Sequence, residues 1–324
     1  MLLNSVDIRK ICFGAIRVFE NEGAVCFERF EGDPIKFYGS SGKSTASVML
    51  DFYTDARSLS FDYKNIRSVG RHHAFYDLYE NEVLIAHFGN AAEEDTSEIV
   101  GSFNTELSAG VKRLRLYLPN LFETRIFNLS LDGVSYVEPV KKEKKLLMMG
   151  DSITHGYDAY FPSLSYANTA AREFNFDMIN QAIGGAMFRT ESLPETSTLT
   201  PDYITVAYGT NDWSWSQKSL SECIDCADAY FKKLRALYRD ARIFYITPLY
   251  RGDESRITSV GDFHGASSAF AEVAKRYGAE IIDGRTMIPH HTLMFDDKYL
   301  HPNDLGFTQY ANALIKKLKE LGVK

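Results

Sequence analysis

The stretch Leu147-Met148-Met149-Gly150-Asp151-Ser152-Ile153-Thr154-His155-Gly156 decides the fold, because an apolar run leads directly into a small polar turn that carries a serine. An α/β fold places a nucleophile at such a strand-to-turn junction. A serine hydroxyl attacks an ester only when a base removes its proton. This interpretation therefore requires a histidine and oxyanion donors elsewhere in the chain.

Three further blocks follow this stretch in order. Asn180-Gln181-Ala182-Ile183-Gly184-Gly185-Ala186 comes after the apolar run 176–179, and Gly209-Thr210-Asn211-Asp212 comes after 203–208. His301-Pro302-Asn303-Asp304-Leu305-Gly306 stands near the C-terminus. Each block alone is an ordinary turn or helix-capping sequence. Four of them in this order favour a catalytic site.

Together the four blocks resemble the SGNH subgroup of the GDSL esterases and lipases, over about residues 145–322. The resemblance implies that Ser152 is the nucleophile and His301 its base. It also implies that the oxyanion rests on the backbone N–H groups of Ser152 and Gly185 and on the Asn211 amide. Fixed donors of this kind contribute roughly 3–4 kcal/mol each, and the chemistry needs no metal or cofactor.

The sequence departs from the family pattern in front of the histidine. The family places an aspartate three residues before it, where this chain has Lys298, and the nearest acid is Asp297, four residues upstream. A one-residue insertion would still let Asp297 accept the Nδ1–H of His301 and turn Nε2 toward Ser152. Two alternatives stay open: a backbone carbonyl orients His301, or Asp296 and Asp297 are solvated loop charges.

Composition limits the class of protein and its partners. A chain of 324 residues with 45% hydrophobic and 24% charged residues is typical of a soluble globular protein with two domains. The net charge of −7 argues against nucleic acid or an anionic membrane as a partner and leaves small-molecule or oligosaccharide ester substrates open. The oligomeric state stays unknown.

We expect a cytoplasmic protein, because the N-terminus shows no secretory signal and no run is long enough to span a bilayer. Four cysteines fit reduced thiols, although one disulfide stays possible. Cys223 and Cys226 have the spacing of a metal or redox motif, but they lie in a helical pattern over 220–238 without a second ligand pair. Core packing is the favoured interpretation.

The chain changes character near residue 140. Before it, β-prone runs recur between turn residues without a convincing amphipathic helix, which predicts an N-terminal β-sandwich domain, jelly-roll-like, over 1–140. The predicted strands are 24–30, 46–53, 58–63, 75–78, 82–88 and 113–118. The charged, proline-containing segment 138–145 is the expected connection between the domains.

After this connection, strand and helix patterns alternate. Such alternation predicts a parallel sheet with helices on both faces, a three-layer α/β SGNH hydrolase domain over 145–324. Its site should lie beyond the carboxyl ends of the strands. We expect strands at 146–149, 176–179, 203–208, 242–247 and 279–282, and helices at about 163–174, 217–238, 265–277 and 303–321.

A β-sandwich ahead of an SGNH domain is similar to carbohydrate esterase family two, whose members remove acetyl groups from polysaccharides and oligosaccharides. Aromatic residues suit sugar rings, and Trp213 and Trp215 follow Asn211 directly, while Tyr157, Tyr160 and Phe161 follow the nucleophile. We expect at least one tryptophan to contact substrate. In the alternative, Trp213 is a core residue and only Trp215 is exposed.

These observations predict a serine esterase that removes acetyl groups from O-acetylated oligosaccharides through an acyl-enzyme on Ser152. Two other functions stay open. A GDSL-type lipase or lysophospholipase would apply the same chemistry to longer acyl chains. A carbohydrate-binding protein with a decayed esterase domain would lack activity, although it would have no reason to keep all four motif residues together.

Overall fold

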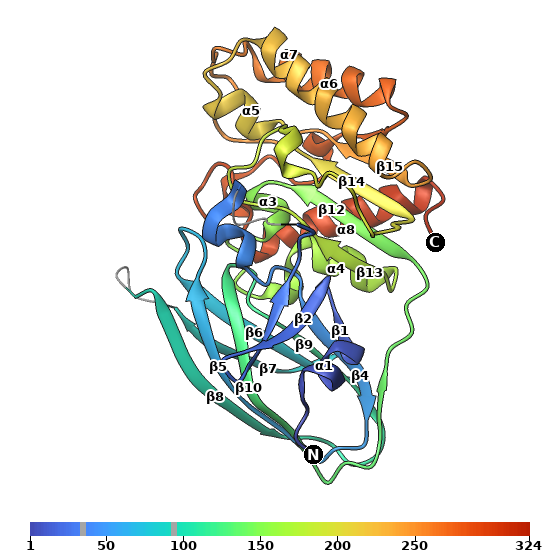
Figure 1. Cartoon of the computed structure of the whole chain (residues 1–324). Coiled ribbons are helices and arrows are strands. Elements are labelled where there is room, and N and C mark those ends of the chain that lie inside the picture. Colours follow the sequence, from blue (N-terminus) through green and yellow to red (C-terminus); the bar gives the residue numbers. More distant parts are fainter. Residues whose placement is uncertain (33–36, 92–95) are drawn as a thin grey trace. The chain divides into compact units, whose positions relative to one another are not determined.

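The computed structural model describes residues 1–32, 37–91 and 96–324. They form two compact units, Met1–Lys142 with Tyr160–Ser163, and Glu143–Ala159 with Leu164–Lys324 (Figure 1). The junction between Lys142 and Glu143 lies inside the charged connection in which the sequence analysis places the domain boundary. The return of Tyr160–Ser163 to the first unit has no signal in the sequence pattern.

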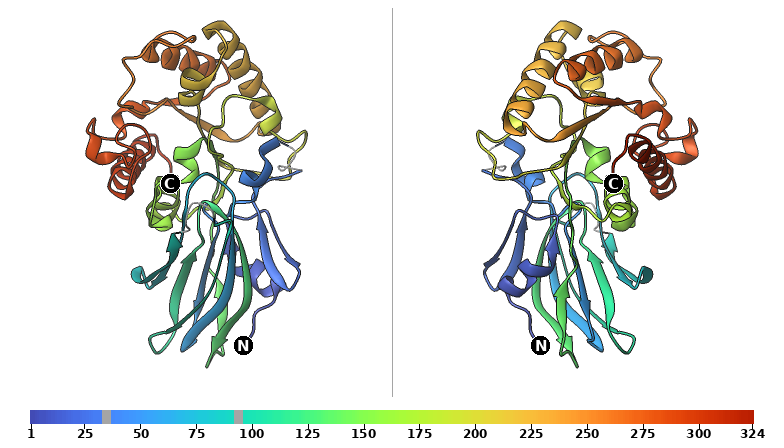
Figure 2. Two further views of the ribbon diagram at one scale, coloured as in Figure 1. Left: turned by 90° about the vertical axis from the view of Figure 1, so that its left-hand side faces the viewer. Right: turned by 90° about the vertical axis from the view of Figure 1, so that its right-hand side faces the viewer.

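The first unit is a sandwich of two antiparallel sheets, which lie face to face (Figure 2). One sheet has the order β1-β4-β9-β6-β7, with β11 also paired to β4, and the other has the order β2-β3-β10-β5-β8. The first sheet comprises β1 (Cys12–Phe13), β4 (Met49–Thr54), β6 (His73–Glu80), β7 (Val83–Ala91), β9 (Lys112–Tyr117) and β11 (Val137–Pro139). The second comprises β2 (Arg17–Asn21), β3 (Ala24–Glu28), β5 (Ser58–Arg67), β8 (Glu98–Glu106) and β10 (Phe122–Asp132).

Side-chain alternation along the strands builds the core of this sandwich. On β5, Leu59, Phe61 and Tyr63 are buried while the residues between them are half-buried. Phe61 and Tyr63 pack against Tyr76 of the opposite sheet, with ring centroids 5.9 and 5.0 Å from its ring. Burial of these large rings stabilises the face-to-face arrangement of the sheets. The predicted β-sandwich is confirmed.

A short helix that the sequence pattern does not predict, α1 (Ser5–Ile11), precedes the strands of this unit. The Asn4 side chain caps it by accepting the Val6 and Asp7 amides, and the helix buries Ile8 and Ile11. A helix of two turns shows too few apolar positions for a periodic signal. A 3₁₀ turn, η1 (Gly39–Lys43), also lies in this unit.

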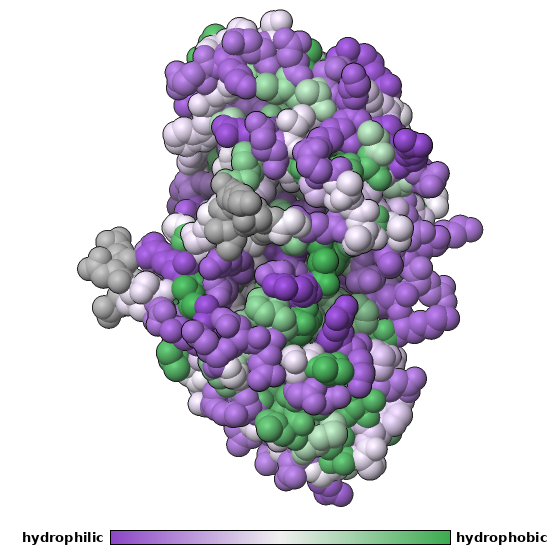
Figure 3. Space-filling model, viewed as in Figure 1, coloured by the Kyte–Doolittle hydropathy of each residue, from purple (hydrophilic) through white to green (hydrophobic). Residues whose placement is uncertain are grey.

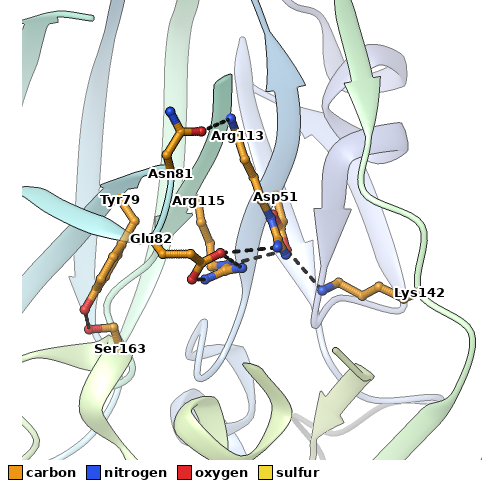
Figure 4. A network of polar contacts seen from close by, with 8 residues as sticks. All are labelled: Asp51, Tyr79, Asn81, Glu82, Arg113, Arg115, Lys142 and Ser163. Atoms are coloured by element: carbon orange, nitrogen blue, oxygen red, sulfur yellow. Dashed lines mark hydrogen bonds and ion pairs between the residues drawn. The ribbon is translucent and has the colours of Figure 1, made fainter. Parts of the chain in front are cut away.

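A buried charge network fixes the end of the first unit (Figure 4). The Asp51 carboxylate is fully buried and accepts hydrogen bonds from Arg113 at 2.8 Å and from Lys142 at 3.0 Å, while Arg115 lies 3.4 Å away. Glu82 pairs with both arginines. Burial raises the pKa of Asp51, but the Arg113 hydrogen bond and the neighbouring cations outweigh burial and hold that pKa below its usual range. Lys142, the last residue of the unit before the junction, is thereby held to β4.

The second unit is a parallel sheet with the order β13-β12-β14-β15-β16 and helices on both faces (Figure 1). This architecture confirms the predicted α/β fold. Its strands are β12 (Lys145–Gly150), β13 (Asp177–Asn180), β14 (Tyr203–Ala207), β15 (Arg242–Ile246) and β16 (Glu280–Ile282). Its α-helices are α3 (Ser152–His155), α4 (Tyr166–Glu173), α5 (Thr210–Trp215), α6 (Leu220–Leu237), α7 (Phe263–Arg276) and α8 (Asp304–Glu320).

Successive side chains of β12 point to opposite faces of the sheet, where different helices cover them. Leu146 and Met148 belong to the apolar core that includes residues of α4 and α8, such as Tyr166 and Tyr310, whose rings stack at 4.2 Å. On the opposite face, the hydroxyl of Tyr230 in α6 lies 3.0 Å from the sulfur of Met149. The strand is therefore buried on both faces, as parallel sheets require.

The structure also describes the state of the cysteines, the polarity of the surface and the apolar character of the helices. All four cysteines are free thiols, and Cys223 is buried in α6 as core packing requires. Figure 3 shows apolar residues scattered among polar ones on one face of the molecule. Within the described ranges, no helix combines the length and apolar character needed to cross a bilayer.

Candidate active site

The nucleophile turn forms where β12 ends. A Cβ on Gly150 would lie 2.1 Å from the Thr154 hydroxyl, so only glycine permits this close return of the chain. Asp151 then caps α3 by accepting the Ile153 amide at 3.0 Å. Ser152 is the first residue of α3, where a backbone N–H has no acceptor inside the helix.

A hydrogen-bonded chain joins the predicted nucleophile, base and acid. The Oγ of Ser152 lies 2.8 Å from Nε2 of His301, and Nδ1 of His301 lies 2.7 Å from Oδ2 of Asp297. A carboxylate at Nδ1 leaves Nε2 free to accept the serine proton, which is the arrangement of a Ser-His-Asp triad. The geometry therefore favours Asp297 over a backbone carbonyl as the group that orients His301.

The backbone around Lys298 explains how an acid four residues upstream reaches the histidine. Lys298 has a left-handed conformation with φ of 71°, which an L-residue rarely adopts. The turn lets Oδ1 of Asp297 accept the amides of Tyr299, Leu300 and His301 at 2.8–3.1 Å. Burial raises the pKa of Asp297, but the hydrogen bonds from His301 and these amides outweigh it and hold the pKa well below its ordinary value. Asp297 is thus an ionised, ordered carboxylate.

The predicted oxyanion donors come together in the same unit. Within the described chain, neither the Gly185 amide nor the Ser152 amide has a hydrogen-bond acceptor. Gly185 has a φ of 78°, and a Cβ there would meet nothing within 4 Å. Asn211 is buried and donates one amide hydrogen to the Ala186 carbonyl at 3.0 Å, which leaves its second hydrogen available. These groups match the donors that the SGNH resemblance implies.

Sequence reasoning missed two buried acids beside this site. Burial raises the pKa of Asp212 to about 7 and that of Asp151 to about 6. Asp212 accepts the Phe188 amide at 3.1 Å with one oxygen, while its other oxygen is buried without a hydrogen-bond partner in the described part of the chain. The position of Asp212 directly after Asn211 is the one signal that pointed to it.

The two tryptophans have different environments. Trp213 is 1% exposed and donates its indole N–H to the Gly261 carbonyl at 3.0 Å, and the guanidinium groups of Arg251 and Arg256 lie 4.9 and 5.1 Å from its ring. The expectation that Trp213 offers a face to a sugar is therefore wrong, and the core alternative holds. Trp215 is 65% exposed at the end of α5. It stays a candidate platform.

The aromatic residues that follow the nucleophile also fall into two groups with different surroundings. The Tyr157 ring lies 5.8 Å from the His301 ring at an interplanar angle of 26°, which places it at the site. Tyr160 and Phe161 belong to the first unit instead, where they stack on His73 at 4.5 Å and on His87 at 3.9 Å. The sequence neighbourhood of Ser152 does not distinguish these two groups.

A Ser-His-Asp chain beside two unpaired amides, at the carboxyl edge of a parallel sheet, defines a serine hydrolase. Residues 148–308 match the GDSL-like lipase/acylhydrolase family. This region of the chain belongs to the family, and the protein is a carboxylic ester hydrolase. No curated protein matches the chain in sequence.

Solved structures share the fold of the whole chain at low sequence identity. A salicylyl-acyltransferase from a tetracycline biosynthetic pathway has a TM-score of 0.81 at 21% identity, covering 96% of this chain and 94% of its own. An acetyl xylan esterase from Butyrivibrio proteoclasticus has a TM-score of 0.68 at 15% identity, covering 100% and 99%. A family two carbohydrate esterase from Clostridium thermocellum has a TM-score of 0.65 at 18% identity, covering 97% and 100%.

Proposed function

We propose that the protein removes acetyl groups from O-acetylated oligosaccharides through an acyl-enzyme on Ser152. The observation that carries the chemistry is the chain of contacts from Ser152 Oγ to His301 at 2.8 Å and on to Asp297 at 2.7 Å. His301 takes the serine proton as Oγ attacks the acyl carbonyl, and then gives it to the departing sugar hydroxyl. Water then attacks the acetyl group on Ser152 while His301 takes a proton from it. His301 returns this proton to Ser152 Oγ as acetate leaves.

The charge that develops on the carbonyl oxygen needs fixed donors. The Ser152 and Gly185 amides and the second amide hydrogen of Asn211 are the groups available for it. Loss of one such donor typically costs 10²–10³-fold in kcat. Asp297 stays ionised and stabilises the imidazolium that forms on His301.

The substrate class rests on two supports. Trp215 is exposed at the end of the helix that begins with Thr210 and Asn211, so an aromatic face and an oxyanion donor share one short element. Two of the proteins with the same fold are carbohydrate esterases, one of them an acetyl xylan esterase. Sugar rings stack on aromatic faces of this kind.

The test is a panel of p-nitrophenyl esters from acetyl to octanoyl, together with acetylated oligosaccharides. We expect acetyl to be hydrolysed fastest, acetate to be released from the sugars, and Ser152→Ala to lower turnover by several orders of magnitude without loss of the fold. A rate that rises with acyl length would favour the lipase alternative. Activity of Ser152→Ala within tenfold of wild type would contradict the assignment of Ser152 as the nucleophile.

Acyl transfer to an alcohol other than water is a second candidate, favoured by the fold shared with the salicylyl-acyltransferase over 96% of this chain. An acyl-enzyme on Ser152 can react with either acceptor, since His301 can deprotonate a hydroxyl as well as water. Hydrolysis of p-nitrophenyl acetate in the presence of sugar alcohols distinguishes the two. Acetylated alcohol in excess of free acetate would indicate a transferase.

A further inference from the structure

In the turn that carries Gly185, the neighbouring backbone amides donate hydrogen bonds to described residues, whereas the Gly185 amide does not. The Ala182 amide donates to the Asn180 side chain at 3.0 Å, the Ile183 amide to the Gly150 carbonyl at 3.0 Å, and the Ala186 amide to the Ile183 carbonyl at 3.0 Å. Within the described residues, the Gly185 amide alone among these neighbours has no acceptor. The amide that remains, that of Gly184, is held by a side chain from outside the turn.

That side chain is His155, the last residue of the helix that begins with Ser152. Its imidazole is fully buried, and Nδ1 accepts the Gly184 amide at 3.2 Å. An Nδ1 that accepts carries no proton, so the neutral ring has its hydrogen on Nε2. His155 therefore links the nucleophile helix directly to the residue before Gly185.

The backbone of Gly184 and Gly185 needs a contact of this kind to fix its conformation. A Cβ on Gly184 would lie 2.2 Å from the Tyr157 hydroxyl, so position 184 has no side chain of its own to fix it. Gly185 has a positive φ, and paired glycines sample many backbone conformations when nothing restrains them. The other contacts of the turn reach residues before the pair, such as Ile183, or after it, such as Ala186.

We propose that His155 is a positioning residue of the oxyanion hole, which holds the Gly184 amide so that the Gly185 amide stays free and fixed for the oxyanion. The proposal rests on the proposed acyl-enzyme function. Misplacement of a reacting or stabilising group by about 1 Å can cost on the order of 10²-fold in rate. His155 itself does not contact the reacting atoms.

Two replacements at this position test the role of the acceptor. His155→Leu removes it, while His155→Asn keeps an acceptor, because the Asn Oδ1 occupies nearly the place of the imidazole Nδ1. Tyr238→Phe is the matched control, since it removes another partly buried side-chain hydrogen bond of the same unit, that of the Tyr238 hydroxyl to Ser197 at 3.0 Å. The readouts are kcat and KM for p-nitrophenyl acetate, the inactivation rate with a small fluorophosphonate, and the melting temperature.

We expect His155→Leu to lower kcat by about 10–100-fold with KM within threefold of wild type. Inactivation by the fluorophosphonate should slow in parallel, since its transition state also places charge in the oxyanion hole. His155→Asn should recover most of the lost kcat, and Tyr238→Phe should match wild type in kcat even if its melting temperature falls. This combination supports the proposal.

Three outcomes overturn it: kcat of His155→Leu within threefold of wild type, His155→Asn as slow as His155→Leu, or Tyr238→Phe as slow as His155→Leu. If the leucine variant does not fold by circular dichroism, a folded His155→Asn with kcat lowered tenfold or more also overturns it. Failure of the proposed function looks different, because wild type would then show no serine-dependent hydrolysis at all.

Discussion

Asp297 contacts His301 at 2.7 Å although it lies four positions, and not three, before the histidine in the sequence. The left-handed backbone of Lys298 absorbs the additional residue. The same turn gives the carboxylate three amide donors, so the acid is held on one oxygen and presents the other to the imidazole. The acid and the base are thus positioned by one short loop.

Asp297→Asn should reduce kcat by about 10²–10⁴-fold, because the amide lacks the charge that stabilises the imidazolium and favours the wrong tautomer of His301. Steady-state kinetics with p-nitrophenyl acetate measure the effect. Asp296→Asn is the control and should behave as wild type. A nearly silent Asp297→Asn would show that a carbonyl can replace the carboxylate.

Lys298→Gly should preserve kcat, since glycine adopts the left-handed conformation without strain. Lys298→Val should lower kcat, because a β-branched residue strongly resists a φ of 71° and would displace Asp297 from His301. The comparison of the two variants in one esterase assay checks the backbone requirement. Equal activity of both would mean that the loop reaches His301 in another conformation.

Trp215→Ala should weaken binding of acetylated oligosaccharides by about 1–3 kcal/mol, a magnitude known for stacking of bases on aromatic rings. Hydrolysis of p-nitrophenyl acetate should hardly change, because this ester has no sugar to stack on the exposed indole. The KM values for both substrates provide the measurement. Sugar-ester activity that survives the replacement would contradict a platform role for Trp215.

Asp212 should make stability depend on pH. Burial raises its pKa to about 7 in the folded protein, while an unfolded aspartate has a pKa of about 3.9. Between these values the unfolded state binds fewer protons, so the free energy of unfolding falls by about 1.4 kcal/mol per pH unit, roughly 4 kcal/mol in all. The stabilisation is complete below pH of about 4 and is lost as the pH rises through about 7.

Urea unfolding of wild type and Asp212→Asn across pH 4–8 measures this dependence. The stability of wild type relative to the variant should fall with rising pH and level off above about pH 7. The asparagine can still accept the Phe188 amide, so the comparison isolates the ionisation. A constant difference at every pH would mean that Asp212 is ionised throughout.

Asp51→Asn should destabilise the first unit by about 3–5 kcal/mol, because it leaves buried Lys142 and Arg115 and half-buried Arg113 without their central carboxylate. Chemical unfolding measures the loss. Asp62→Asn is a suitable control, since that carboxylate is only slightly buried and accepts from Ser102 and Asn128 at the surface. If Asp51→Asn lowers the free energy of unfolding by less than about 1 kcal/mol, the network contributes little to stability.

Much of the second unit follows from the sequence, because long helices and buried parallel strands leave strong patterns. The helices predicted at 217–238 and 303–321 match α6 (Leu220–Leu237) and α8 (Asp304–Glu320) closely. The nucleophile, the glycine and the asparagine are predictable for the same reason, since each follows an apolar strand of the sheet. The identity of the orienting acid depends on the φ of one residue, Lys298, which no pattern encodes.

The burial of Trp213, and not of Trp215, has a geometric reason. Residues two apart share a face on a strand but point in nearly opposite directions on a helix. Since 210–215 form the helix α5, Trp213 is buried while Trp215 is exposed. The β-sandwich was predictable as a class, yet strands β2, β8 and β10 carry so many polar residues on their outer faces that their apolar content alone does not reveal them.

The membership of Tyr160–Ser163 in the first unit has a consequence for biosynthesis. Asp77 of β6 accepts the Ser163 amide at 2.9 Å, and the Tyr79 hydroxyl lies 3.0 Å from that of Ser163, so the sandwich completes its own contacts only with residues that follow the nucleophile. A chain emerging from the ribosome folds its N-terminal part first. These two contacts of β6 with Ser163 can therefore form only after the segment that follows Ser152 has also been translated.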